Sequence, residues 1–315
     1  MKNKEPLILV VVIFFTLAVY YLVEPFAHSQ MHKHFESEGF AYNDLPALTK
    51  TGDAARGKDL VLGAAACVGC HAISKEGMSA PMAPVDAAGA YGVNPPDLSN
   101  AGAVYDAKFL ASLIKNPTHA LMVEHKFDPA KGKVYPMPAF YGAGGDIDQE
   151  VADIVSYLQS IAVKGEEFTP TIAFETACGR CHANRYEKWT PIGETPTFKH
   201  KQDKLAFEIN VANYEDSLTK YMGKLPPDLS IYIRSRGEHF IKTFVENPQQ
   251  YLEGTAMPRV GVNAESAAKV IEYLEDSGDT KRHERDHVGK NVMIYIVIFA
   301  IFALLWKKEV WKDLH

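Results

Sequence analysis

The chain has 315 residues and a formal charge of −6, and 47% of its residues are hydrophobic. This length is enough for two domains of ordinary size, and the hydrophobic content is enough to give them cores. A mean hydropathy of −0.15 is too polar for a chain that mostly crosses lipid, which excludes a polytopic transporter. The acidic balance, without a long basic run, excludes a nucleic-acid partner.

The first predicted element is a membrane-spanning helix at residues 7–23. This stretch has no charged residue, and as a helix it would extend about 26 Å, which is just long enough to cross a bilayer. The alternative is a cleaved signal peptide, because residues 26–29 weakly resemble a cleavage site. The apolar run is longer than such peptides usually have, so we expect an N-terminal anchor over residues 1–24.

The four cysteines lie in two C-x-x-C-H pentapeptides, residues 67–71 and 178–182. This spacing is the attachment motif of c-type haem, in which two thiols add to the vinyl groups of one porphyrin and the histidine faces the iron. A thioredoxin-like motif lacks the surrounding βαβ pattern here, and a Cys₂His₂ zinc site needs a different histidine spacing. The sequence predicts two covalently attached haem c groups, held by Cys67, Cys70 and His71 and by Cys178, Cys181 and His182.

The region between the two ends repeats itself. Each haem motif is followed, in the same order, by a Pro-Pro-Asp-Leu-Ser segment, an Asn-Pro pair, a Met-Pro pair and a closing helical pattern. The paired positions are 95–99 and 226–230, 116–117 and 247–248, 137–138 and 257–258, and 154–158 and 270–274. A shared order of landmarks indicates two copies of one module, here named the first unit (residues 51–163) and the second unit (residues 164–278).

Each unit is predicted to be a small helical domain. Residues 52–66 have an apolar face at helical spacing, and both units end in apolar positions that recur every three or four residues. In the Pro-Pro-Asp-Leu-Ser segment the prolines favour an extended backbone, and the Asp or Ser is suited to cap a helix. The second unit has an insertion before this segment, predicted as a solvated basic loop that carries Lys199, His200, Lys201 and Lys204.

Met137 and Met257 are the predicted sixth ligands of the two irons. Each precedes a proline, which holds a loop in an extended shape suited to present a thioether. The alternatives are that either methionine fills a core, or that the ligand is Met78, Met82, Met122, His119 or His125 in the first unit and Met222 or His200 in the second. Only Met137 and Met257 recur in register. Closed His and Met ligation suits electron transfer, so no catalytic site is expected in this chain.

A second membrane-spanning helix is predicted over residues 291–306, within a C-terminal anchor and tail of residues 291–315. The stretch is uncharged and is followed by tryptophans and lysines, which suit the interface between lipid and water. Lysines flank the outer ends of both spans, so the positive-inside rule places both termini in the cytoplasm. The two units then lie on the opposite side of the membrane, joined to the spans by linkers at residues 25–50 and 279–290.

The motifs resemble a known family. The two C-x-x-C-H motifs, the later Met-Pro pairs and the closing helices resemble tandem class I cytochrome c domains. In the second unit, the Pro-Pro-Asp-Leu-Ser segment is followed by Arg234 and Arg236, a Met-Pro loop and a C-terminal anchor with a tail rich in Trp and Lys. That arrangement resembles the c-type cytochrome subunit of cytochrome bc complexes, in particular the dihaem cytochrome c subunit of bacterial quinol:cytochrome c reductases.

The resemblance implies a mainly α fold, with two tandem cytochrome c domains between an N-terminal and a C-terminal transmembrane helix. It implies a place in the bacterial inner membrane, with the haem domains on the periplasmic side. The partners would be a Rieske iron–sulfur subunit, a cytochrome b subunit, and a soluble cytochrome c or terminal oxidase. The chain departs from the usual subunit of this family, which has one haem and no N-terminal span. Arg234 and Arg236 would pair with haem propionates or lie on the surface.

Two other functions stay open at the level of sequence. The dihaem subunit of a cbb-type cytochrome c oxidase also has two c-haem modules, but it is anchored from the N-terminal side alone. A dihaem cytochrome c peroxidase needs one iron with an open position, which the two methionines in register disfavour.

Overall fold

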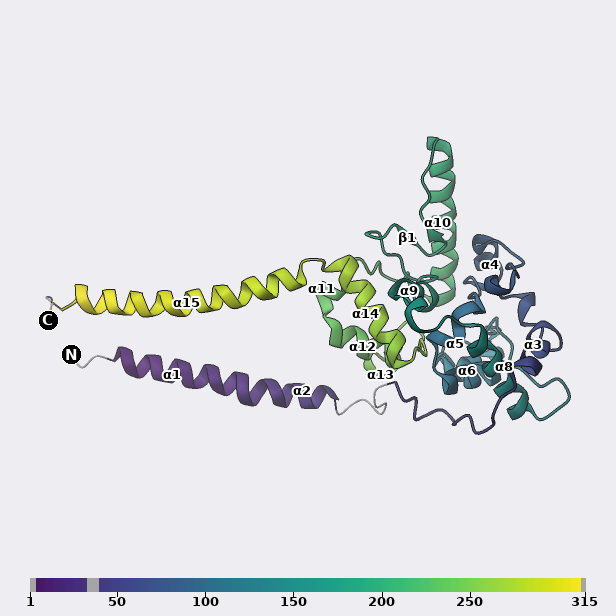
Figure 1. Cartoon of the computed structure of the whole chain (residues 1–315), viewed down its shortest axis with the longest axis horizontal. Helices are drawn as coiled ribbons and strands as arrows, with labels where there is room; N and C mark the ends of the chain where they lie inside the picture. Colours follow the sequence, from purple (N-terminus) through teal and green to yellow (C-terminus); the bar gives the residue numbers. More distant parts are fainter. Residues whose placement is uncertain (1–3, 33–39, 313–315) are drawn as a thin grey trace.

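The structure is a computed structural model that describes residues 4–32 and 40–312. A helical body carries two long terminal helices that run side by side away from it (Figure 1). Within the described ranges the only strands are β1 (Trp189–Thr190) and β2 (Gly193–Glu194), a short antiparallel pair. The prediction of a mainly helical chain is confirmed.

The first unit folds around two helices that pack against each other, α3 (Ala54–Leu62) and α8 (Ile147–Ile161). These are the helix predicted within residues 52–66 and the closing helix. Gly57 brings them close, because a Cβ at this position would lie 2.0 Å from the backbone oxygen of Asp153. The other helices, which lie between them in the chain, are η2 (Cys67–Gly69), η3 (Ser74–Glu76), α4 (Pro84–Tyr91), η4 (Leu98–Asn100), α5 (Ala101–Val104), α6 (Ala107–Lys115), α7 (Pro117–Ala120) and η5 (Pro129–Lys131).

The second unit uses the same pair of helices. Its first helix, α9 (Pro170–Ala177), packs on its closing helix, α14 (Ala264–Gly278). The ring of Phe174 stacks on that of Tyr273 at a centroid distance of 4.2 Å. The other helices near and within this unit are η6 (Gly165–Glu167), α10 (Lys201–Met222), α11 (Tyr232–Arg236), α12 (Glu238–Glu246) and α13 (Pro248–Tyr251).

The Asn-Pro landmarks of the two units adopt the same local structure. Asn116 and Asn247 have nearly identical backbone angles, with φ of −150° and −147°. Each side chain caps a one-turn helix by accepting a hydrogen bond from the amide three residues later, as asparagine does at N-caps. Proline follows as the first residue of the helix, where its missing N–H costs nothing.

The insertion of the second unit forms a helix where a basic loop was expected. Helix α10 projects away from the body (Figure 1), and the basic residues Lys201 and Lys204 lie on its exposed first turn. Only its second half is anchored, by the buried side chains of Tyr214 and Leu218, and it packs there on α4 of the first unit. Helix α10 therefore links the two units.

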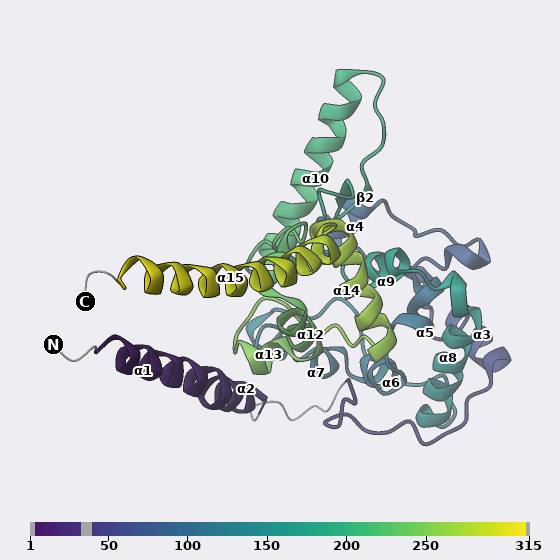
Figure 2. The same ribbon diagram turned by 60° about the vertical axis from the view of Figure 1, so that its left-hand side comes forward.

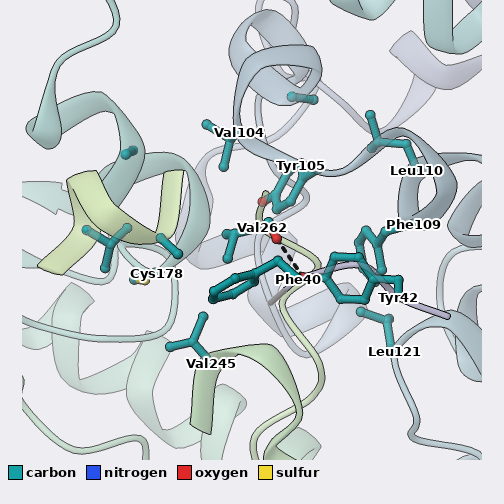
Figure 3. Close-up of a cluster of buried hydrophobic side chains, with 14 of the residues drawn as sticks. Phe40, Tyr42, Val104, Tyr105, Phe109, Leu110, Leu121, Cys178, Val245 and Val262 are labelled. Carbon is teal, nitrogen blue, oxygen red and sulfur yellow. Dashed lines mark hydrogen bonds between the residues drawn. The ribbon is translucent and has the colours of Figure 1, made fainter. Parts of the chain in front are cut away.

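The main hydrophobic core is shared by the two units and by a segment that precedes them (Figure 3). This segment, residues 40–45, is here named the strap. Phe40, Tyr42 and Leu45 are buried in it, and the Tyr42 hydroxyl donates a 2.6 Å hydrogen bond to the carbonyl of Val262. The strap lies within the range expected to be a linker, residues 25–50, of which residues 33–39 are outside the described ranges.

The terminal helices extend beyond the apolar stretches read from the sequence. Helices α1 (Glu5–Ala18), η1 (Val19–Val23, a π-helical segment) and α2 (Glu24–His32) form one continuous rod, and α15 spans Arg282–Val310. Both are long and apolar enough to cross a membrane, and neither is buried in the body. They run in the same general direction in both views (Figure 2), and Lys307 pairs with Glu5 at 2.6 Å near their far ends.

We expect Gly57→Ala to lower the free energy of unfolding of the haem-loaded chain by about 2 kcal/mol or more, because the added Cβ would overlap backbone of α8. Urea unfolding followed by circular dichroism measures this. The matched control is Gly89→Ala in α4, where a Cβ would meet nothing within 4 Å. The control is expected to be neutral or slightly stabilising, and equal losses in the two variants would contradict the close helix packing.

A second prediction concerns Asp153, whose carboxylate is buried and accepts hydrogen bonds from Arg56, Gln149 and the amide of Asp53. The hydrogen bond from Arg56 is the main cause that lowers its pKa to about 2. A lowered pKa in the folded state stabilises the fold above the unfolded pKa, near 4, and this contribution is lost as the pH falls toward about 2.

Asp153→Asn should therefore remove much of the loss of stability between pH 4 and pH 2, a contribution of about 2 kcal/mol. Thermal unfolding across this pH range measures it. Asp148→Asn, which changes an exposed carboxylate of the same helix, should alter the pH slope far less. A slope unchanged in Asp153→Asn would refute the assignment.

Candidate haem cavity

A cavity of about 750 Å³ lies inside the helical body, and both haem motifs open into it. Its walls come from both units and are mostly aliphatic and aromatic. All the residues predicted as haem ligands or attachment points line it: Cys67, Cys70, His71, Met137, Cys178, Cys181, His182 and Met257. The sequence predicted two sites, and the structure brings their residues to one continuous space.

The two haem motifs adopt the same backbone turn. In the first, the amide of His71 donates to the carbonyl of Cys67 at 2.9 Å. In the second, the amide of His182 donates to the carbonyl of Cys178, also at 2.9 Å. None of these four cysteines forms a disulfide. The turn therefore holds two thiols and one imidazole of each motif on a single loop at the cavity wall.

Each motif histidine has one ring nitrogen fixed by the Pro-Pro-Asp-Leu-Ser segment. Nδ1 of His71 lies 2.8 Å from the carbonyl oxygen of Pro96, and Nδ1 of His182 lies 2.8 Å from that of Pro227. A carbonyl oxygen only accepts, so Nδ1 is the protonated nitrogen and Nε2 keeps its lone pair. This is the usual arrangement of a histidine that ligates a metal, since the second hydrogen bond sets both the tautomer and the ring orientation.

Burial adjusts the protonation of these groups. It lowers the pKa of both His71 and His182, so each imidazole is neutral near pH 7 and able to bind iron. Burial also raises the pKa of Cys178 to about 12 and raises that of Cys67.

The Pro-Pro-Asp-Leu-Ser segments are held to their motifs by matching hydrogen bonds. The amide of Leu98 donates to the carbonyl of Ala72, and the amide of Leu229 donates to that of Ala183, both at 2.9 Å. The serine hydroxyls of the two segments accept from the amides of Lys75 and Tyr186. Asp97 caps the helix η4, as expected. The segment thus acts as a brace for the axial histidine and as a wall of the cavity.

The two methionine loops are fixed by different contacts. The amide of Phe140, three residues after Met137, donates to the carbonyl of Ile114 at 2.9 Å. The side-chain amide of Gln249 donates to the carbonyls of Thr255 and Met257. Of the alternative ligands, Met222 also lines the cavity, whereas Met78, Met82, Met122, His119, His125 and His200 do not.

Two aromatic residues and the two arginines considered from the sequence have defined places. Tyr91 lines the cavity. Trp189 braces the second motif, because its indole Nε1 donates to the carbonyl of Gly179 at 2.8 Å. Neither Arg234 nor Arg236 lines the cavity, and Arg236 instead lies over the ring of Phe240.

The cations that line the cavity are not the two arginines considered from the sequence. Arg180, Lys224 and Arg259 line it, and no Asp or Glu from the described ranges does so. A cavity with cations and without carboxylates suits a ligand that carries carboxylates, as haem does in its propionates. These residues were not found from the sequence, since Arg180 is only one of the two variable positions of its motif and Arg259 is an isolated arginine.

The walls, the thiols, the oriented imidazoles and the cations therefore fit haem c. Haem c would supply reversible one-electron chemistry at the iron. Cysteines of a motif would hold it, the motif histidine would ligate it, and the apolar walls would keep water away.

Comparison with known proteins agrees with this chemistry. Residues 54–162 match the family Cytochrome c. Cytochrome c1 of Allochromatium vinosum is 22% identical over 240 residues, a match that covers 56% of this chain and 94% of that protein. A chain in the structure "Hyperthermophilic respiratory Complex III" is 22% identical, with a TM-score of 0.34, and the match covers 49% of this chain and 80% of that one.

The family match defines the class: residues 54–162 form a cytochrome c domain, a kind of domain that carries covalently bound haem c and transfers electrons. The chain is also distantly similar to cytochrome c1. The predicted resemblance to cytochromes c is confirmed at this level.

Tyr214 gives a test of how the two units meet beside the cavity. Its buried hydroxyl donates to the carbonyl of Arg180 at 2.7 Å and accepts from the amide of Asn94 at 3.2 Å. We expect Tyr214→Phe to destabilise the folded chain by about 1–3 kcal/mol, because two backbone groups lose their partner. Urea unfolding measures this. Tyr186→Phe, at a residue 60% exposed, is the control, and a Tyr214→Phe variant as stable as the control would contradict the link.

Proposed function

We propose that the chain is a membrane-anchored dihaem cytochrome c of a quinol:cytochrome c reductase. It would take electrons from the Rieske iron–sulfur protein and deliver them to a soluble cytochrome c or a terminal oxidase. The observation that carries the proposal is that both motifs present the same hydrogen-bonded imidazole to one cavity. The relationship to cytochrome c1 supports the assignment to a cytochrome bc complex.

Each unit would hold one haem c with a closed ligand set. In the first unit, Cys67 and Cys70 would attach the haem, and His71 and Met137 would ligate the iron. In the second unit, Cys178, Cys181, His182 and Met257 would take these roles. Both methionines line the cavity and are the pair that recurs in register. Because His and Met occupy both axial positions, each unit would transfer electrons without binding a substrate.

The arrangement of the units suggests a direction of electron flow. The second unit, which contains α11 to α14, lies next to the terminal helices, and the first unit lies at the far end of the body (Figure 1). A partner in the membrane would therefore reach the second unit first, and a soluble acceptor would reach the first unit. The cavity that both motifs share would keep the path between the units short and free of water.

The terminal helices would anchor the chain with both termini in the cytoplasm and the units in the periplasm. Their length and composition are sufficient for crossing a bilayer. The ion pair of Glu5 and Lys307 would then lie at the cytoplasmic ends of the two spans. Their exposed apolar side chains would face lipid and the cytochrome b subunit.

The number of haems is the first prediction to test. Replacing Cys67 and Cys70 together with Ala should leave one covalent haem per chain in place of two, and the same change at Cys178 and Cys181 should have the same effect. A pyridine haemochrome assay against protein concentration measures the ratio. One haem per wild-type chain would refute the dihaem proposal.

A second experiment distinguishes the methionines that ligate iron from another methionine of the cavity. Met137→Leu and Met257→Leu should each remove half of the methionine-to-iron charge-transfer band. Met222→Leu is the matched control, since Met222 lines the same cavity outside the repeated register. A band reduced only in the control would assign the ligand to Met222.

Purification from mildly solubilised membranes through a C-terminal tag tests the partners. Cytochrome b and a Rieske protein in the eluate would support the reductase. A copper-containing oxidase subunit would favour the cbb-type oxidase, and a chain that purifies alone with peroxidase turnover would favour the peroxidase.

A further inference from the structure

The segment that precedes Met137 in the first unit packs on the end of a helix of the second unit. The last carbonyl groups of a helix have no partner inside it, and two lysines of this segment bind those of α10. Nζ of Lys126 donates to the carbonyl of Met222 at 3.4 Å, and Nζ of Lys133 donates to that of Tyr221 at 3.3 Å. Positive charge at this end of a helix is stabilising, because it complements the partial negative charge there.

The two lysines lie close enough to affect each other. Burial lowers the pKa of Lys126, and the charge of Lys133 lowers it further. Two like charges are therefore held together at the end of α10, and the helix carbonyls offset their repulsion.

Aromatic rings fill the space between this helix end and the segment. The ring of Phe127 is buried, with the ring of Tyr135 at a centroid distance of 5.0 Å and that of Tyr221 at 5.2 Å. Burial raises the pKa of Tyr221, and the neighbouring Tyr135 raises it further. Tyr221 also lies against the end of α4, because a Cβ at Gly92 would come within 2.2 Å of its ring. Two elements of the first unit thus hold the ring of Tyr221.

These contacts continue directly into the methionine loop. Only Pro136 separates Tyr135 from Met137, and a second proline follows the methionine, so the backbone here is stiff. After Met137, the amide of Phe140 donates to the carbonyl of Ile114 at 2.9 Å. The loop is therefore attached to the second unit before the methionine and to its own unit after it.

The methionine loop of the second unit is held by a residue of that same unit. The side-chain amide of Gln249 donates to the carbonyl of Met257 at 3.1 Å. A change at the end of α10 is therefore expected to affect Met137 and to leave Met257 in place.

We propose that Tyr221 of α10 is a positioning residue for Met137, so that the second unit holds the iron ligand of the first. The inference rests on the proposed function, in which Met137 ligates the iron of the first haem. Tyr221 would act through the ring of Tyr135 and the stiff Pro136. Methionine ligation raises the reduction potential of a haem, so the potential of the first haem would depend on a helix of the second unit.

The oxidised, haem-loaded full-length chain with Met257→Leu is suited to test the proposal. Its remaining methionine-to-iron charge-transfer band belongs to the first haem, and added imidazole removes this band by displacing Met137. Tyr221→Ala should weaken the band and lower the imidazole concentration that removes half of it by about tenfold, because the ring contacts are lost. Tyr221→Phe should restore both values, since it keeps the ring.

Tyr232→Ala is the matched control, because Tyr232 is another tyrosine of the second unit that lines the cavity and lies on α11. It should leave the band and the imidazole concentration unchanged. Unchanged values in Tyr221→Ala, or equal changes in the control, would overturn the proposal. A band that survives Met137→Leu in the same background would instead refute the proposed ligand set, so the two failures are distinguishable.

A second variant covers the case in which Tyr221→Ala does not fold. Lys126→Met and Lys133→Met together remove the hydrogen bonds to the end of α10 and leave every ring in place. The imidazole concentration that removes half of the band should fall by about threefold. No change in this variant would overturn the proposal.

Discussion

The hydrogen bond from each motif histidine to a proline carbonyl organises the structure around the cavity. It joins residues 25 positions apart in the first unit and 45 apart in the second, yet the distance is the same in both. The bond leaves Nε2 as the free ligand nitrogen, and it places the Pro-Pro-Asp-Leu-Ser segment as a wall beside the imidazole. The insertion in the second unit is accommodated by helix α10, which leaves the body before the segment returns to its motif (Figure 1). The extra residues of the second unit therefore leave the geometry at the histidine unchanged.

The two units are fused rather than merely linked. The chain pairs Tyr105 with Val262 across them, and the amide of Asp106 donates to the carbonyl of Gly261 at 2.9 Å. Gly261 has a φ of 78°, and a Cβ there would lie 2.0 Å from the ring of Phe109, so only glycine allows this approach. The strap fills the same junction. A core of this kind makes the units one cooperative body, which keeps the two motifs at a constant separation.

The sequence predicted those helices and motifs that depend on residues close together in the chain. The haem motifs, the closing helices and the apolar terminal helices all follow from spacing within short windows. The strap did not, because Phe40 and Tyr42 lie in a short segment without periodicity and are buried by contacts with residues far away in the sequence, such as Phe109, Glu246 and Val262. Helix α10 was expected as a loop, because its first turns are basic and exposed, and its packing on the body depends on the buried Tyr214 and Leu218 further along the helix. The burial of Arg259 and its hydrogen bonds to Ala120 and Asp44 depend on tertiary contacts, which no spacing reveals.

The cations of the cavity come from one unit and make contacts with the other. Arg180, Lys224 and Arg259 all belong to the second unit, but the two arginines are turned toward the first. Arg180 donates to the carbonyl of Asn94, and Arg259 donates to that of Ala120 while its own amide donates to that of Leu121. Positive charge at this junction favours the reduced state most on the side that it approaches. In the proposed dihaem carrier, electrons that enter at the second unit, beside the terminal helices, would therefore move downhill toward the first unit. In this proposal the repeat would supply two equivalent sites, and the arginines would make them unequal.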